Sequence, residues 1–167
     1  LDREGWHLPG SSETFCLDEI DEEADYHKVF YKDRWIKEDL SQRKIKNGAK
    51  PLEQHLIVSF SSKYKNYQRK IRKGQIDRAQ KLIDSGNYKQ RPKNQNDPHR
   101  FIVREKATKD GEICSEELVY LDTDAILEEE RYDGFYAVCT NLNDMSVDEI
   151  VKINKKRWEI EECFRFM

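Results

Sequence analysis

The sequence SVDEIVKINKKRWEIEECFRFM, residues 146–167, predicts a long amphipathic helix at the end of the chain. Ser146 and Glu149 have the spacing of a capping box, which marks the start of a helix. Beyond them the apolar side chains recur every three or four residues and form one broad stripe. Its members are Ile150, Ile153, Trp158, Ile160, Phe164 and Met167.

Four polar residues interrupt this apolar stripe: Asn154, Arg157, Glu161 and Arg165. Their spacing of three, four and four residues places them within the apolar arc and not at its solvent edge. Burying an unpaired charge costs several kcal/mol, which is on the order of the whole stability of a domain. Some partner must therefore offset the burial of Arg157 and Glu161.

Two interpretations of Arg157 and Glu161 follow from the residues alone. The first is an ion pair across one helical turn, although Arg placed before Glu is the weaker order for such a pair. The second is a site for a divalent cation and a phosphodiester, in which Glu161 binds the metal and Arg157 contacts the phosphate. The residue pattern leaves both interpretations open.

The stretch YDGFYAVCTNLNDMSVDEIVKINKKRWEIEECFRFM, residues 132–167, resembles the end of the catalytic domain in bacterial insertion-sequence transposases of the DDE type. In one subgroup of that family, the catalytic Glu lies in a signature of Tyr, two residues, Arg, three residues, Glu, six residues and Lys. Arg157 and Glu161 fit that spacing. Asn154 occupies the Tyr position, and the Lys position would follow the last residue.

Residues 55–86 and the sequence NDPHRFI, residues 96–102, resemble the segment that precedes this signature in the same family. The likeness thus covers about two-thirds of the chain. It implies a partial ribonuclease-H-like core, in which two Asp and one Glu hold two Mg²⁺ ions, or Mn²⁺ in their place. It also implies that Glu161 is a catalytic residue and metal ligand, and that the scissile phosphate or DNA end is contacted by Arg157, Asn154 and Arg165.

The resemblance further implies a division of the chain. Residues 1–131 correspond to the insertion between the second catalytic Asp and the Glu, and residues 132–167 to the last core strand and the Glu-bearing helix. No segment matches the two Asp motifs, and Asp2, Asp18 and Asp133 are poor candidates for them. We therefore expect a fragment that is inactive alone and holds no tightly bound metal.

The family activity is cleavage of transposon ends and their joining to target DNA. The resemblance therefore implies that the parent protein is a transposase whose partners are double-stranded DNA, as transposon ends and as target, and further copies of itself. A nuclease on the same fold, without strand transfer, is a third possibility.

Charge is strongly segregated along the chain, although its net value is only −3. Residues 1–40 carry twelve acidic and five basic side chains, residues 61–106 four acidic and fourteen basic, and residues 107–167 sixteen acidic and seven basic. The basic segment begins with a predicted helix, residues 61–85, and such an excess attracts a phosphate backbone in a salt-dependent manner. The candidate DNA-backbone residues are Lys63, Lys65, Arg69, Lys70, Arg72 and Lys73.

A Lys-rich helix face is more commonly just a solvated surface. If it does bind nucleic acid, the chain could instead be a noncatalytic binding module with Glu161 merely paired to Arg157. The buried side of the same helix is predicted to carry Tyr64, Tyr67, Ile71, Ala79, Leu82 and Ile83.

Alternation and turn residues predict an α+β fold with a mixed, largely antiparallel sheet, the long basic helix and the C-terminal amphipathic helix. The predicted strands are residues 27–36, 55–60, 101–107, 116–121 and 136–140, with an acidic helix or turn at 122–130. The sequence contains neither a signal peptide nor a long apolar run, which predicts a cytoplasmic protein with no membrane partner.

Overall fold

The computed structural model describes residues 2–37, 52–88, 94, 96–106 and 117–156. It divides into two compact units. Unit 1 comprises Leu1–Tyr64 and Gly134–Met167, and unit 2 comprises Lys65–Asp133. The chain leaves unit 1 after Tyr64 and re-enters it at Gly134, close to residue 132, where the resemblance places the start of the last core strand. Whether residues 1–131 are an insertion is a question of homology, so that division stays a prediction.

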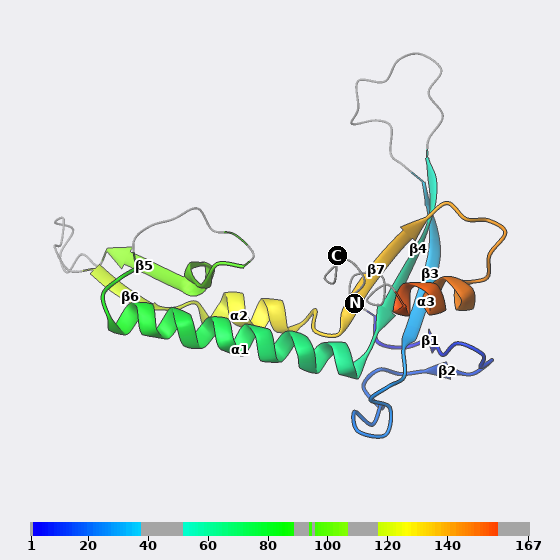
Figure 1. Ribbon diagram of the computed structural model, residues 1–167, viewed down its shortest axis with the longest axis horizontal. Coiled ribbons are helices and arrows are strands. Elements are labelled where there is room, and N and C mark those ends of the chain that lie inside the picture. Colours follow the sequence, from blue (N-terminus) through cyan, green and yellow to red (C-terminus); the bar gives the residue numbers. More distant parts are fainter. Residues whose placement is uncertain (1, 38–51, 89–93, 95, 107–116, 157–167) are drawn as a thin grey trace, which may run out of the picture. The chain divides into compact units, whose positions relative to one another are not determined.

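Unit 1 is built on a five-stranded sheet with the order β2-β1-β3-β4-β7 (Figure 1). The strands are β1 (Trp6–His7), β2 (Thr14–Phe15), β3 (Phe30–Lys37), β4 (Glu53–Phe60) and β7 (Phe135–Thr140). Each pairing between them is antiparallel. The predicted strands at 27–36, 55–60 and 136–140 are confirmed, as is the predicted α+β class with a largely antiparallel sheet.

The sheet of unit 1 buries side chains on both faces because successive residues of a strand point to opposite sides. Phe30 and Phe60 are register partners and pack with Trp6 and Leu17 in one core. Ile57, three residues before Phe60, lies on the other face in a second core. An element must cover that second face, and helix α3 does so.

Helix α3 (Val147–Lys155) begins with the predicted capping box, in which the Ser146 and Glu149 side chains bond each other's backbone N–H groups. Ile150 and Val151 are buried against Ile57 and Val29. The predicted apolar stripe is partly wrong, because Ile153 is 58% exposed and Val151 is buried instead. Helix α3 ends at Lys155, with Lys156 as its C-cap, whereas the prediction extended the helix to Met167. Residues 157–167 lie outside the described residues.

Unit 2 packs a long helix against a hairpin and two short helices. Its elements are α1 (Ser62–Asp84), which starts in unit 1, the 3₁₀ helix η2 (Pro98–Phe101), β5 (Ile102–Lys106), β6 (Glu117–Leu121) and α2 (Thr123–Glu130). Strands β5 and β6 form an antiparallel pair. The basic helix, the hairpin and the short acidic helix are thus confirmed. Their core contains Ala79, Phe101 and Ile102.

The buried side of α1 differs from the predicted one. Ala79 is fully buried, but Tyr67 and Ile71 are 59% and 43% exposed. Arg72 and Gln75 are buried in their place. The reason is that unit 2 provides hydrogen-bonding partners for both polar side chains. Hydrophobic periodicity alone would place these two side chains in solvent.

Replacing the helix cap tests the anchoring of α3. We expect Ser146→Ala to lower the free energy of unfolding by about 1 kcal/mol, because the N–H of Glu149 loses its side-chain acceptor and the Glu149 carboxylate loses the Ser146 hydroxyl. Urea denaturation followed by circular dichroism measures the change. Ser12→Ala, at an exposed position of the same unit, is the matched control and should have little effect. An unchanged midpoint for Ser146→Ala would contradict the assigned cap.

Candidate functional site

The structure describes only part of the predicted metal and phosphate site. Asn154 lies in the last turns of α3 and is half-buried. Glu161, Arg157 and Arg165 lie outside the described residues. What the structure adds is the arrangement of the helix that leads to them.

The first turn of α3 is tied to two distant parts of unit 1 through Asp148. One carboxylate oxygen accepts a hydrogen bond from the backbone N–H of Gly10 at 2.8 Å, and the other accepts from the Tyr31 hydroxyl at 3.0 Å. Burial, followed by this bond to Asp148, raises the pKa of Tyr31 to about 12. Sequence reasoning missed Asp148, since no local pattern relates it to residues 10 and 31.

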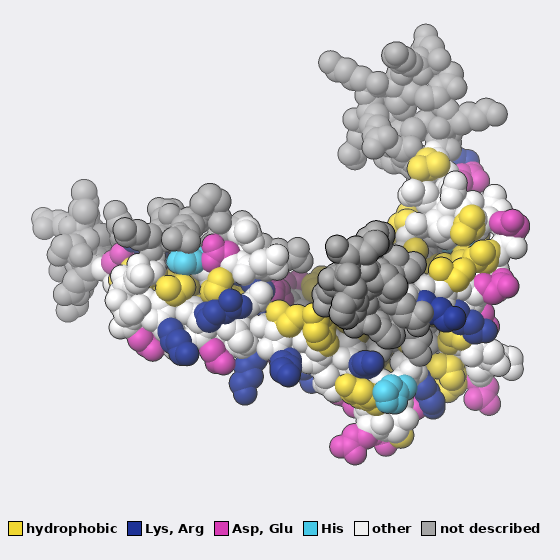
Figure 2. Space-filling view, in the orientation of Figure 1, with side chains coloured by type: hydrophobic (Ala, Val, Ile, Leu, Met, Phe, Trp, Pro, Cys, Tyr) yellow, Lys and Arg dark blue, Asp and Glu magenta, His cyan; other side chains and the backbone are white. Residues whose placement is uncertain are grey.

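The six predicted DNA-backbone residues of α1 differ in how exposed they are and in whether they are paired. Lys63, Lys70 and Lys73 are exposed, and no ion pair or hydrogen bond joins their ammonium groups to other described residues. Lys65 is half-buried, and Arg69 is exposed although its Nε lies 3.6 Å from Asp133. Figure 2 shows Lys and Arg side chains following α1 along its outer side, with acidic side chains between them. The exposed ammonium groups of Lys63, Lys70 and Lys73 could therefore donate hydrogen bonds to phosphate.

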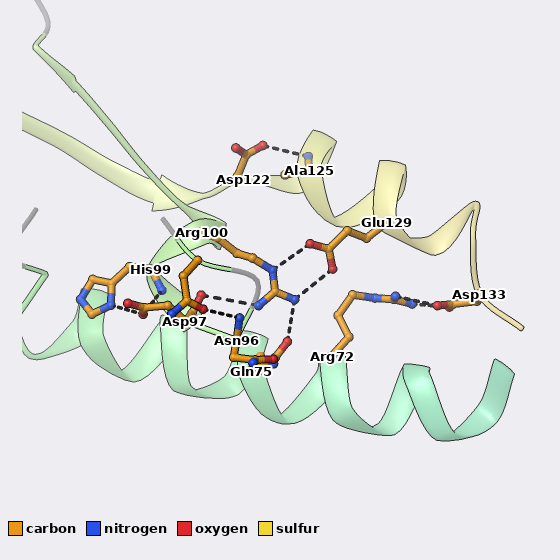
Figure 3. Close-up of polar contacts among 11 residues, drawn as sticks. Arg72, Gln75, Asn96, Asp97, His99, Arg100, Asp122, Ala125, Glu129 and Asp133 are labelled. Atoms are coloured by element: carbon orange, nitrogen blue, oxygen red, sulfur yellow. Dashed lines mark hydrogen bonds and ion pairs between the residues drawn. The ribbon is translucent and has the colours of Figure 1, made fainter. Parts of the chain in front are cut away.

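Arg72 is the exception, and its prediction as a surface DNA contact is wrong. Its side chain is 7% exposed and forms a two-pronged pair with Asp133, with Nη1 donating to Oδ1 at 2.7 Å and Nη2 to Oδ2 (Figure 3). Glu130 lies 3.7 Å from the same guanidinium. The hydrogen bonds with Asp133 raise the pKa of Arg72 above its ordinary value. This guanidinium joins α1 to the segment after α2 and is not available to DNA.

A second, partly buried guanidinium comes from the NDPHRFI segment. Arg100 donates to Glu129 of α2 at 2.8 and 3.0 Å and to Gln75 of α1 at 2.6 Å, and it lies over the Phe101 ring (Figure 3). Asp97 caps the short helix that carries Arg100. This segment therefore connects α1 to α2 within unit 2.

The aspartates that sequence reasoning set aside are all in ion pairs. Asp2 is 2.8 Å from Lys32, Asp18 is 2.9 Å from Arg3, and Asp133 holds Arg72. Among the described residues, no three His, Cys, Asp or Glu side chains gather as a metal-ligand set. In the same part of the chain, no helix has both the length and the apolar character needed to cross a bilayer.

Compared with protein-family models, with curated proteins and with solved structures, the chain has no match. The transposase assignment therefore rests on the signature around Arg157 and Glu161 and stays a prediction.

Breaking the buried pair tests the structural role assigned to Arg72. Asp133→Asn should lower the free energy of unfolding by about 3–5 kcal/mol, because it removes the two-pronged counter-charge of a buried guanidinium and leaves only Glu130, 3.7 Å away. Replacing both residues by leucine should recover much of that loss. Urea denaturation gives the values.

Glu128→Gln is the control for Asp133→Asn. It breaks the exposed Glu128–Arg131 pair, 2.9 Å long, and should cost under about 1 kcal/mol. Equal effects of Glu128→Gln and Asp133→Asn would mean that the Arg72 pair is no more important than a surface contact.

Proposed function

We propose that this chain is part of a DDE transposase, a DNA-cleaving and DNA-joining enzyme that acts by metal-dependent phosphoryl transfer. The observation that carries the proposal is the spacing of Asn154, Arg157 and Glu161 in the sequence. In the proposal, the two catalytic Asp belong to a part of the parent protein that this chain does not contain. Unit 2 and the rest of residues 1–131 would be the insertion that precedes the Glu-bearing helix.

The sequence on either side of Glu161 supports this reading. In α3 the buried or half-buried residues are Val147, Asp148, Ile150, Val151 and Asn154. In the sequence, Trp158, Glu161 and Arg165 follow Asn154 at spacings of four, three and four residues. A carboxylate placed among apolar residues in this way fits a protected metal site better than it fits a solvated surface.

The chemistry of the proposed enzyme consists of two in-line displacements at phosphorus. Water attacks the phosphodiester at the transposon end, and the bond to the 3′ oxygen breaks to leave a 3′ hydroxyl. That hydroxyl then attacks a target phosphodiester, forms the new P–O bond and displaces the target's own 3′ oxygen. When bound, Mg²⁺ would stabilise the charge on the attacking and leaving oxygens. Glu161 would be one ligand, and Arg157, Asn154 and Arg165 would hold the phosphate or the DNA end.

The exposed lysines of α1 support the DNA-binding part of the proposal. Lys63, Lys70 and Lys73 lie on a helix within a segment that carries fourteen basic and four acidic residues, in a chain of net charge −3. Such a local excess favours phosphate contacts without base specificity. Joining of two transposon ends also requires self-association in the active complex. Action on DNA would place the enzyme in the bacterial cytoplasm.

Removing the proposed metal ligand tests the activity. In the full-length protein, Glu161→Gln should abolish end cleavage in Mg²⁺ while leaving affinity for the DNA end largely intact, because the amide cannot replace the carboxylate as a ligand. Glu162→Gln, one residue away on the opposite side of the predicted helix, is the matched control and should cleave normally. Product analysis separates strand transfer from simple nuclease action. Retained cleavage in Glu161→Gln would overturn the assignment.

Arg157→Ala separates the phosphate-binding role from the structural ion pair. It should slow end cleavage, because the scissile phosphate loses its guanidinium. Lys156→Ala is the control. If Arg157 is only a partner of Glu161, a double-mutant cycle will show strong stability coupling that Mg²⁺ does not alter, and cleavage by Arg157→Ala will be normal.

The noncatalytic alternative, in which α1 alone carries the function, is tested through salt dependence. Replacing Lys63, Lys70 and Lys73 together by Gln should weaken DNA binding for all sequences and reduce the slope of log K against log salt by up to about 3. The control is Lys28→Gln with Lys37→Gln, two lysines that are already paired to Asp25 and Glu53. Unchanged affinity and slope in the triple variant would exclude α1 as the DNA-binding surface.

A further inference from the structure

Gly74 lies in the interior of α1, where glycine is less favourable than alanine because it loses more conformational freedom on folding. Its φ is not positive, unlike that of Gly86, which lies just beyond the end of the helix. A Cβ atom at position 74 would meet no other part of the described chain within 4 Å, the backbone of its own helix aside. Neither backbone geometry nor packing among the described residues therefore requires a glycine here.

Gly74 is at the centre of the outer side of α1 in unit 2. Arg72, Gln75 and Ala79 are buried and mark the inner side. At 3.6 residues per turn, six other unit 2 residues of α1 lie within about 60° of Gly74 around the helix axis, and all of them are exposed. We call this surface the Gly74 face, and its six other members are Tyr67, Lys70, Ile71, Asp77, Arg78 and Lys81.

The Gly74 face is positively charged, with three basic residues and one acidic residue, Asp77. No ion pair or hydrogen bond joins the ammonium groups of Lys70 and Lys81 to other described residues. Arg78 donates from Nε to the carbonyl of Gly74 at 3.0 Å, a bond that any residue at position 74 could accept. Lys70 and Arg78 lie four residues before and after Gly74, about 6 Å away in each direction along the helix axis. Cations thus flank a point of the surface that has no side chain of its own.

This arrangement suits a phosphate backbone better than it suits a second protein helix. A packed helix needs a continuous apolar stripe, but the Gly74 face has only Tyr67 and Ile71, which are 59% and 43% exposed. A phosphate backbone needs positive charge and hydrogen-bond donors, which lysine, arginine and tyrosine side chains supply. It also gains from glycine, because the absence of a Cβ atom allows a phosphate group to approach the main chain closely. Charge complementarity therefore favours nucleic acid as the partner of this face.

We propose that the sugar-phosphate backbone of double-stranded DNA crosses α1 at Gly74, so close to the helix that a side chain at this position would obstruct it. Lys70 and Arg78 bind phosphates on the two sides of the crossing point. The inference rests on the DNA-binding part of the proposed function. It adds the point of closest approach, which the positions of the exposed lysines do not define by themselves.

The test uses the full-length protein and measures its binding to a fluorescent DNA duplex of random sequence over a range of salt concentrations. Gly74→Leu should weaken binding several-fold and reduce the slope of log K against log salt by about 1 to 2, because the backbone is held away from one or two cations. Gly74→Ala should have a smaller effect in the same direction. Both variants should raise the urea midpoint of unfolding, since leucine and alanine favour the helix and the space at position 74 is open. Loss of affinity in a more stable protein cannot result from misfolding, and Gly74→Ala decides the question if Gly74→Leu does not fold.

Two controls locate the effect on the helix. Gln80→Leu adds the same side chain at an exposed position of α1 that lies about 120° around the axis from Gly74, and it should bind DNA as the wild type does. Asp77→Asn removes the negative charge of the Gly74 face and should strengthen binding, because Asp77 repels a phosphate that crosses one turn away. Asp84→Asn, two turns beyond Asp77, should have a smaller effect.

The outcomes distinguish this inference from the proposed function. If both Gly74 variants keep the wild-type affinity and slope while the triple variant of Lys63, Lys70 and Lys73 is weakened, the crossing point is wrong and α1 remains a DNA-binding surface. If the triple variant is also unchanged, the DNA-binding role of α1 is wrong and the crossing point is wrong with it.

A protein partner would give a different result. If Gly74→Leu keeps its DNA affinity but changes the self-association measured by analytical ultracentrifugation, the Gly74 face binds another copy of the protein and the inference is overturned. Weaker binding in both Gly74 variants, together with stronger binding in Asp77→Asn and unchanged binding in Gln80→Leu, supports the inference.

Discussion

The central strand β4 is the constraint on which unit 1 depends. It pairs with β3 along its whole length and with β7 from His55 to Phe60, and its side chains enter a core on each face. Phe60 contributes to the core with Trp6, and Ile57 to the core beneath α3. A strand that is paired at both edges and buried on both sides has little freedom, so the elements packed on it inherit a defined place. The start of α3 is one of them.

Sequence patterns predicted an element correctly where a single local effect determines that element. It predicted the central strands, the long helix α1 and the capping box at Ser146, because alternation, length and local hydrogen bonding each decide those features. It failed where a distant partner decides. Arg72 and Gln75 face inward because they form hydrogen bonds with Asp133 and Arg100, respectively. No sequence pattern within α1 reveals these distant partners. Ile153 was misassigned for the same kind of reason.

For the candidate site, the polar residues within the apolar stripe of the predicted last helix and their resemblance to a transposase signature point to Glu161 and Arg157. Both residues lie outside the described part of the chain, so their roles stay a prediction. The charge count identified α1 but could not tell paired from unpaired cations, and so it included Arg72 with Lys63, Lys70 and Lys73. Asp148 could not be found at all, since its two partners are more than a hundred residues away in the sequence.

Strands β4 and β7 are the two arms of a β-hairpin whose connection is an entire subdomain. Phe60 is the register partner of Phe135, and the N–H of Ser61 donates to the carbonyl of Gly134 at 3.0 Å, so the chain returns to the place where it left. Residues 65–133 can therefore be shortened, enlarged or exchanged without disturbing a single strand pairing of unit 1. This junction allows a whole subdomain to evolve separately from the sheet and from the start of α3.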